Sequence, residues 1–179
     1  MATTKENLRD QGIITLCGKI NTETIIKVVE NIVLMNNIQN PEFDAIQLIL
    51  NSTGGSIYAG FELIDIMEYS RLPVYVTGLG CCASMGHMIL CAGKKGHRVV
   101  TKNTTLLSHQ FSWSSDGKYH ELVADRKQQS IFHRRLVNHY LKHTKLNKKQ
   151  VESILLPKSD VWMTPQEAKK YGIVDKVIG

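Results

Sequence analysis

Residues 74–92 read Val-Tyr-Val-Thr-Gly-Leu-Gly-Cys-Cys-Ala-Ser-Met-Gly-His-Met-Ile-Leu-Cys-Ala. The mostly β-branched run that follows Pro73 is typical of a strand. Glycines and small residues then permit a sharp turn, and Ser84 opens a short apolar segment that predicts a buried helix ending near Ala92. A strand, a turn and a helix in this order are the repeating unit of an α/β protein.

The same alternation continues on both sides of this segment. We expect further strands over residues 12–18, 45–50, 97–100, 105–108 and 173–178, and helices over 21–37, 57–69, about 119–143 and 165–171. Such alternation argues for parallel strands joined by right-handed crossovers. The helix from about 119 to 143 contains no Gly or Pro, and a helix this long on a small domain needs a partner to pack against, which favours an oligomer.

Size and composition describe one ordinary domain. The chain has 179 residues, 42% of them hydrophobic and 21% charged, as in a soluble globular protein. Its polar N-terminus suggests no signal peptide, and no apolar run approaches the roughly 20 residues of a membrane span. We expect a single domain over 1–179 in the cytoplasm, without membrane association. Four cysteines without C-x-x-C spacing are expected to be buried in a reducing compartment.

The net charge of +6 does not by itself indicate a nucleic-acid partner. Much of the basic excess lies between Arg126 and Lys149, interleaved along a helical pattern. Neither an aromatic RNA-binding motif nor a Gly-rich phosphate loop accompanies it. We therefore interpret these residues as a solvated helix face and expect no binding to nucleic acid.

Ser84 is the first candidate catalytic residue. It stands among small residues between a strand and a helix, which resembles a nucleophile elbow, although Cys82 occupies a position where that motif has Gly. The alternative is a serine that only caps the helix. A serine nucleophile also needs a base, and His109, directly after the strand 105–108, is the best placed histidine. His139 and His143 are expected on the solvated side of the long helix.

A third residue must orient the base. Spacing alone does not choose between Asp116, Asp125 and Asp160, the last of which lies in an irregular stretch before the capped helix at Thr164. A second glycine-rich junction, residues 51–56, could point backbone N–H groups toward a developing negative charge. An ordinary strand-to-helix turn is the alternative there.

Four segments together resemble the proteolytic subunits of the Clp protease family: 51–60, 80–90, 108–110 and 160–175. The resemblance extends from about Gly12 to Ile178 and is specific because all four motifs occur in the right order and at the right separations. It implies the α/β fold shared with crotonases, built of repeated β-β-α units with a long protruding handle helix. The head would comprise about 12–110 and 155–179, and the handle about 111–154.

The resemblance also implies a function and roles for particular residues. The chain would be a serine endopeptidase that cleaves unfolded polypeptides inside stacked heptameric rings, fed by an ATPase of the Clp type, without a cofactor or metal. Ser84 would be the nucleophile, His109 the general base and Asp160 the residue that orients it. The backbone N–H groups of Gly55 and Met85 would form the oxyanion hole.

Three alternatives stay open at this point. A catalytically inactive ring subunit of the same fold would be expected to lack triad residues, whereas all three candidates are present. An acyl-CoA lyase or hydratase of the crotonase type would leave Ser84 and His109 without a role. A nucleic-acid-binding module would rest on positive charge alone.

Overall fold

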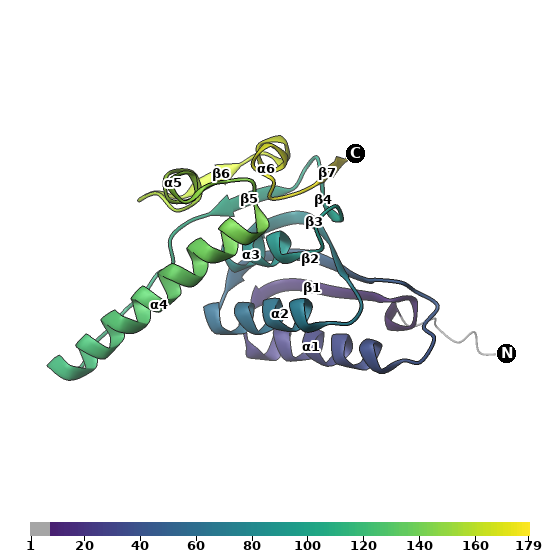
Figure 1. Ribbon diagram of the computed structural model, residues 1–179, viewed down its shortest axis with the longest axis horizontal. Helices are drawn as coiled ribbons and strands as arrows, with labels where there is room; N and C mark the ends of the chain where they lie inside the picture. The colour runs from purple at the N-terminus through teal and green to yellow at the C-terminus, as the bar shows by residue number, and fades with distance from the viewer. Residues whose placement is uncertain (1–7) are drawn as a thin grey trace.

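The structure is a computed structural model that describes residues 8–179. The expectation of no signal peptide concerns the N-terminus, and residues 1–7 lie outside the described part. Figure 1 shows an α/β body with one long helix, α4, that projects from it. None of the helices within 8–179 is long and apolar enough to cross a membrane.

The elements follow one another in this order along the chain. After a 3-10 turn η1 (Leu8–Gln11), the strands are β1 (Ile13–Ile20), β2 (Ile46–Gly55), β3 (Val74–Ala83), β4 (Arg98–Thr101), β5 (Thr105–Ser108), β6 (Val161–Met163) and β7 (Lys176–Ile178). The helices are α1 (Thr22–Asn37), α2 (Ile57–Tyr69), α3 (Met85–Ala92), α4 (Tyr119–His143), α5 (Lys148–Gln150) and α6 (Pro165–Tyr171), and a π-helical turn η2 (Val151–Leu155) follows α5.

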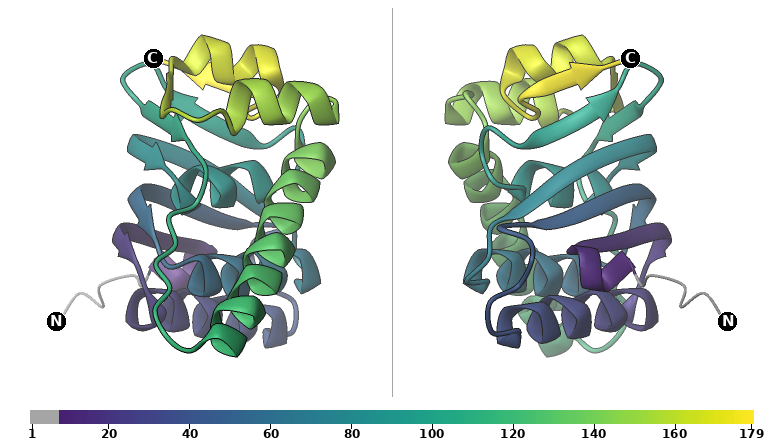
Figure 2. Two further views of the ribbon diagram at one scale, coloured as in Figure 1. Left: turned by 90° about the vertical axis from the view of Figure 1, so that its left-hand side faces the viewer. Right: turned by 90° about the vertical axis from the view of Figure 1, so that its right-hand side faces the viewer.

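The strands form one seven-stranded sheet with the order β1-β2-β3-β4-β7. All pairs along this path are parallel, which confirms the prediction of a parallel α/β core. The end of β3 also pairs in parallel with β5, and β5 pairs antiparallel with β6. Both views in Figure 2 show the strands stacked from β1 to β7, with α1 and α2 side by side beneath them. The sheet therefore carries β5 and β6 at the end of β3 where Ser84 lies.

Local capping explains why several helices begin and end where the sequence predicts. Asn21 Oδ1 accepts a hydrogen bond from the Thr24 amide (2.9 Å) at the start of α1. At α6, Thr164 and Glu167 cap each other reciprocally, and Gly172 ends the helix in the left-handed region at φ 76°. The predicted bounds of α1, α2, α4 and α6 are confirmed.

Other predicted bounds are wrong. The strands β2 and β3 continue past their glycines to Gly55 and Ala83, because pairing with neighbouring strands resumes after an irregularity in the register. The last strand is only Lys176–Ile178. The helical residues 148–155 and the strand β6 were not predicted at all.

The cysteine prediction also needs correction. Cys82 and Cys91 are buried, and burial raises the pKa of each thiol to about 12. Cys17 is exposed and Cys81 is half-buried, because both lie on the side of the sheet that points away from the helices. The outward residues Gln47 and Ile49 of β2 are also only half-buried. This face of the sheet is thus incompletely covered by the part of the chain that the structure describes.

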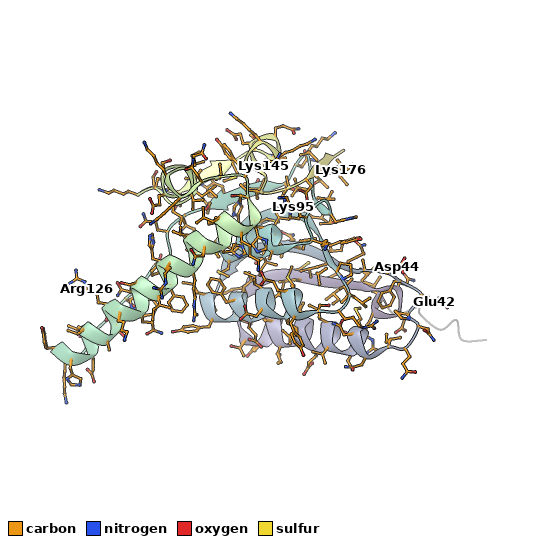
Figure 3. All side chains as sticks on the ribbon, viewed as in Figure 1. Glu42, Asp44, Lys95, Arg126, Lys145 and Lys176 are labelled. Carbon is orange, nitrogen blue, oxygen red and sulfur yellow. The ribbon has the colours of Figure 1, made fainter. Side chains whose placement is uncertain are left out.

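The basic residues between Arg126 and Lys149 lie on the surface, as the sequence predicts. Arg126, Lys142, Lys145 and Lys149 are all exposed, as expected of a solvated helix face and the turn after it. In Figure 3, Lys145 and Lys176 lie near α6 and β7, whereas Glu42 and Asp44 lie at the opposite end of the body. The basic excess is therefore spread along α4 and the C-terminal layer.

One buried ion pair ties that C-terminal layer to the centre of the protein. The Arg98 guanidinium, 2% exposed, binds both carboxylate oxygens of Asp175 (2.9 and 2.7 Å). It also donates to the carbonyl oxygen of His143 at the end of α4 (2.6 Å). Burial works against the charge on Asp175, but hydrogen bonds from Arg98 outweigh it and lower the pKa of the carboxyl. The pair thus joins β4, α4 and the segment before β7.

We predict that Asp175→Asn lowers the free energy of unfolding by about 3–5 kcal/mol, because it leaves the Arg98 charge buried without its partner. Urea denaturation at a fixed protein concentration measures this. Glu152→Gln is the matched control, since it breaks an exposed pair with Lys148 and should change stability by less than about 1 kcal/mol. Equal effects of the two variants would contradict the role given to Arg98.

Candidate active site

Ser84 occupies a strained turn between β3 and α3. Its backbone has φ 55° and ψ −122°, and Asn40 is the only other non-glycine residue with positive φ among those described. Such a conformation costs roughly 1–3 kcal/mol and persists only where the surroundings impose it. Two hydrogen bonds do so here: the Ser84 amide donates to the Leu107 carbonyl oxygen (2.9 Å), and the Met88 amide donates to that of Ser84 (3.2 Å).

The hydroxyl group of Ser84 contacts His109 instead of capping its own helix. The side chain makes no capping hydrogen bond to α3. Its Oγ lies 2.8 Å from Nε2 of His109. The alternative in which Ser84 serves only as a helix cap is therefore wrong, and the serine hydroxyl is in reach of a base.

Strand pairing brings His109 to this position. In the parallel pair of β3 with β5, Ala83 lies opposite Leu107. The chain leaves the sheet after Ser108, so that His109 follows β5 directly beside the turn at Ser84. The His109 side chain is 26% exposed, which leaves the imidazole open to a substrate while the sheet fixes its backbone.

Asp160 lies on the other side of the imidazole. In the antiparallel pair of β5 with β6, Ser108 is opposite Val161, so the preceding residue Asp160 faces His109. Its Oδ1 is 3.9 Å from Nδ1 of His109, longer than a hydrogen bond, and the side chain is 61% exposed. Asp125, by contrast, accepts a hydrogen bond from Ser115 in the segment before α4. Of the three candidate acids, Asp160 is the one with a contact to His109.

The glycine-rich end of β2 packs directly against the turn. A Cβ atom on Gly54 would lie 2.6 Å from Cβ of Ser84, and one on Gly55 would lie 2.1 Å from the Ile20 carbonyl oxygen. Both glycines also have positive φ. Only glycine fits such close approaches. Met85 begins α3 beside this loop, and the first amides of a helix have no acceptor within it.

A small apolar cavity of about 20 Å³ adjoins Ser84 and His109. Besides these two residues, its walls are Ile57, Met85, Met88, Phe111, Leu136 and Tyr140. Side chains from α2, α3, α4 and the segment after β5 thus enclose a cavity beside the serine hydroxyl.

The expectation that His139 is solvated is wrong. The side chain is only 6% exposed, and Nε2 lies 2.9 Å from the Met88 carbonyl oxygen. Burial lowers its pKa to about 3. His143 is half-buried and contacts Glu68 (3.2 Å). Among residues 8–179, no cluster of three His, Cys, Asp or Glu side chains could hold a metal ion.

Sequence reasoning missed residues that border the site. Tyr140, at a buried position of α4, reaches the cavity beside Ser84. Its spacing from Leu136 and Val137 on the helix would have indicated a core position, but not proximity to a serine 56 positions earlier in the chain.

An α/β sheet with a serine at a strained strand-to-helix turn and a histidine within hydrogen-bond distance is typical of serine hydrolases. Comparison with known proteins narrows this class. The family model described as Clp protease matches residues 1–179. The chain belongs to the Clp protease family.

Individual relatives agree with that family. The chain is 34% identical to the ATP-dependent Clp protease proteolytic subunit of Deinococcus radiodurans over 171 residues, which are 96% of this chain and 81% of the relative. It is 32% identical to the ATP-dependent Clp protease proteolytic subunit 2 of Thermobifida fusca over 98% of this chain and 84% of the relative. The subunit of the same description from Corynebacterium glutamicum is also 32% identical, over 97% and 84% of the two chains.

We predict that Ser84→Gly stabilises the protein by about 1 kcal/mol, because glycine adopts positive φ without strain. Ser84→Ala keeps the Cβ atom and the strain, so it is the matched control and should bring no such gain. Urea unfolding of the two variants measures the difference. Equal stabilities would mean that the turn at Ser84 stores no strain.

Proposed function

We propose that the chain is a serine endopeptidase in which Ser84 attacks the peptide carbonyl carbon. The observation that carries this proposal is the 2.8 Å separation of Ser84 Oγ from His109 Nε2. Membership of a family whose relatives are named as proteolytic subunits supports it. Ser84 donates its proton to Nε2 as it attacks, so that the imidazole must start neutral with its own proton on Nδ1.

The remaining steps use groups that surround this pair. The tetrahedral oxygen anion accepts hydrogen bonds from the backbone amides of Gly55 and Met85. His109 then returns its proton to the leaving amine, and the acyl group stays on Ser84. Water, activated by the same histidine, releases the acyl group and regenerates the serine. Asp160 stabilises the imidazolium and orients its Nδ1–H, which requires the present 3.9 Å separation to shorten.

The walls of the cavity beside Ser84 include the apolar side chains of Ile57, Met88 and Phe111. At about 20 Å³ the cavity has room for about one water molecule and not for a substrate side chain. It therefore supports apolar surroundings for the cleaved bond and defines no pocket for a particular side chain.

We propose further that the chain acts inside stacked heptameric rings in the cytoplasm, with α4 as the handle between two rings. Support comes from the first half of α4, which projects from the body in Figure 1. This half exposes apolar side chains: Tyr119 is 83%, Leu122 40% and Val123 53% exposed. Exposed apolar groups in a row favour burial against another copy.

A second apolar surface supports assembly within one ring. It is a groove of about 750 Å³ between α1, α2 and α4, in which Tyr58 is 59% and Tyr69 86% exposed.

The relatives are named ATP-dependent, which supports an ATPase of the Clp type as the partner that delivers unfolded polypeptides.

We predict that Ser84→Ala and His109→Ala each lower kcat for a fluorogenic peptide by several orders of magnitude, because nucleophile and base act as one unit. The double variant should be no worse than either single variant. Substantial cleavage by purified Ser84→Ala would contradict the assignment. A folded, assembled wild type without any cleavage would favour the inactive ring subunit.

We predict that Asp160→Asn lowers kcat by roughly a hundredfold or more and leaves some turnover, since the histidine loses its orienting charge but keeps its contact with Ser84. Steady-state kinetics on the same peptide measures this. Asp125→Asn is the matched control and should stay within about twofold of wild type. A larger loss in Asp125→Asn than in Asp160→Asn would identify Asp125 as the orienting acid.

A further inference from the structure

A chain of buried hydrogen bonds runs behind the Ser84–His109 pair. The Tyr140 hydroxyl on α4 lies 3.1 Å from Nδ1 of His87 and 3.0 Å from Oγ of Ser108. Ser108 in turn donates to the Leu155 carbonyl oxygen (2.7 Å). His87 and Ser108 are fully buried, and Tyr140 is 2% exposed. Three side-chain groups thus form one polar path through an otherwise apolar interior.

Apolar side chains would fill these positions without the need for partners. The neighbours of His87 on α3 are Met88, Ile89 and Leu90, all of them buried. Burying a hydroxyl or an imidazole is unfavourable unless its hydrogen bonds are made, and the bonds then add little to stability beyond offsetting that cost. The polar path is therefore a poor means of stabilising the core, and its geometry near the active site points to another use.

Counting the protons shows that the hydrogen bonds of the polar path can be donated in only one direction. A carbonyl oxygen only accepts, so the Ser108 proton must point to Leu155. The Tyr140 hydroxyl then donates its one proton to Ser108, since burial raises the pKa of Tyr140 and keeps it protonated. His87 must consequently donate from Nδ1 to the Tyr140 oxygen.

The state of His87 agrees with this order. Burial lowers its pKa to about 4, so the neutral ring carries one proton near pH 7. That proton sits on Nδ1. The other nitrogen, Nε2, is buried and has no hydrogen-bond partner within residues 8–179, which fits an unprotonated ring nitrogen that has no proton to donate. Every proton in the three hydrogen bonds of the polar path is therefore assigned, and no other arrangement of protons keeps all three bonds.

The two ends of the path are attached to the two halves of the active site. His87 lies three residues after Ser84, on the helix that the nucleophile begins. Ser108 is the last residue of β5 and directly precedes His109. Leu155 belongs to η2, which leads toward Asp160. A rigid link between these elements fixes how far the imidazole stands from the serine hydroxyl.

We propose that Tyr140 is a positioning residue whose hydroxyl, bonded to His87 and Ser108, holds His109 within hydrogen-bond distance of Ser84. This role rests on the proposed peptidase function, because it has a consequence only if Ser84 is a nucleophile. The tyrosine ring also borders the cavity beside Ser84. Phenylalanine at this position keeps the ring and removes only the hydroxyl, so the two contributions are separable.

The test is Tyr140→Phe in the full chain, with Tyr171→Phe as the matched control on α6, where the tyrosine ring is half-buried against the core and far from the proposed ring contacts. For Tyr140→Phe we expect kcat on a fluorogenic peptide to fall about tenfold with KM within about twofold of wild type, because alignment is lost and the cavity is kept. The rate of Ser84 modification by a fluorophosphonate probe should fall to a similar extent. Tyr171→Phe should match wild type in both assays.

Ser108→Ala removes the same hydrogen bond from its other side and should give the same loss. It carries the test if Tyr140→Phe does not fold. The double variant should be no slower than the slower single variant, because both changes break the shared bond between Tyr140 and Ser108. Additive losses, or a change confined to KM, would overturn the positioning role.

Failure of the positioning role is distinguishable from failure of the peptidase assignment. If the wild type is reactive, and Tyr140→Phe and Ser108→Ala both equal it in kcat and in labelling rate, only the positioning role is overturned. A folded wild type whose Ser84 neither reacts with the probe nor supports cleavage would overturn the peptidase assignment, and the positioning role with it.

Discussion

The hydrogen bond from the Ser84 amide to the Leu107 carbonyl oxygen, 2.9 Å long, is the constraint on which the site depends. It continues the parallel pairing of β3 with β5 to the turn itself. This pairing holds Ser84 at positive φ and sets His109, two residues after Leu107, beside the serine hydroxyl. A slip of one residue in the pairing would turn His109 to the opposite face of the sheet. The chemistry therefore depends on the register of two strands.

Much of the fold is predictable because its signals are local. Asn21, Thr164 and Gly172 mark helix ends through their own side chains or backbone freedom, and the structure places the ends there. The strand β6 escaped prediction because it has only three residues and owes its existence to pairing with β5. The glycines after Thr77 suggest an end to β3, but pairing of Cys81, Cys82 and Ala83 with β5 continues the strand to Ala83.

The site was predictable to a different degree at each residue. Ser84 and His109 each follow a strand and carry the side chain that the chemistry needs, so the sequence indicates both. The sequence alone did not separate Asp160 from Asp125, because the contact of Asp160 with His109 results from the unpredicted pairing of β5 with β6. The burial of His139 and the polar path through Tyr140 depend on how α4 packs on α3, which no local pattern encodes.

The same packing explains how a strained turn can be stable. Gly54 and Gly55 allow the end of β2 to contact the turn at Ser84, and α3 behind it is buried from Met85 to Cys91. The burial of this apolar helix favours folding by far more than the strain at one residue opposes it. The most direct measurement is peptide mapping by mass spectrometry after reaction of the wild-type protein with a fluorophosphonate probe. A single adduct on Ser84, absent when His109 is replaced by alanine, is the result that a serine peptidase requires. An unmodified Ser84 in folded protein, or adducts on other serines instead, would contradict the assignment of Ser84 as the nucleophile.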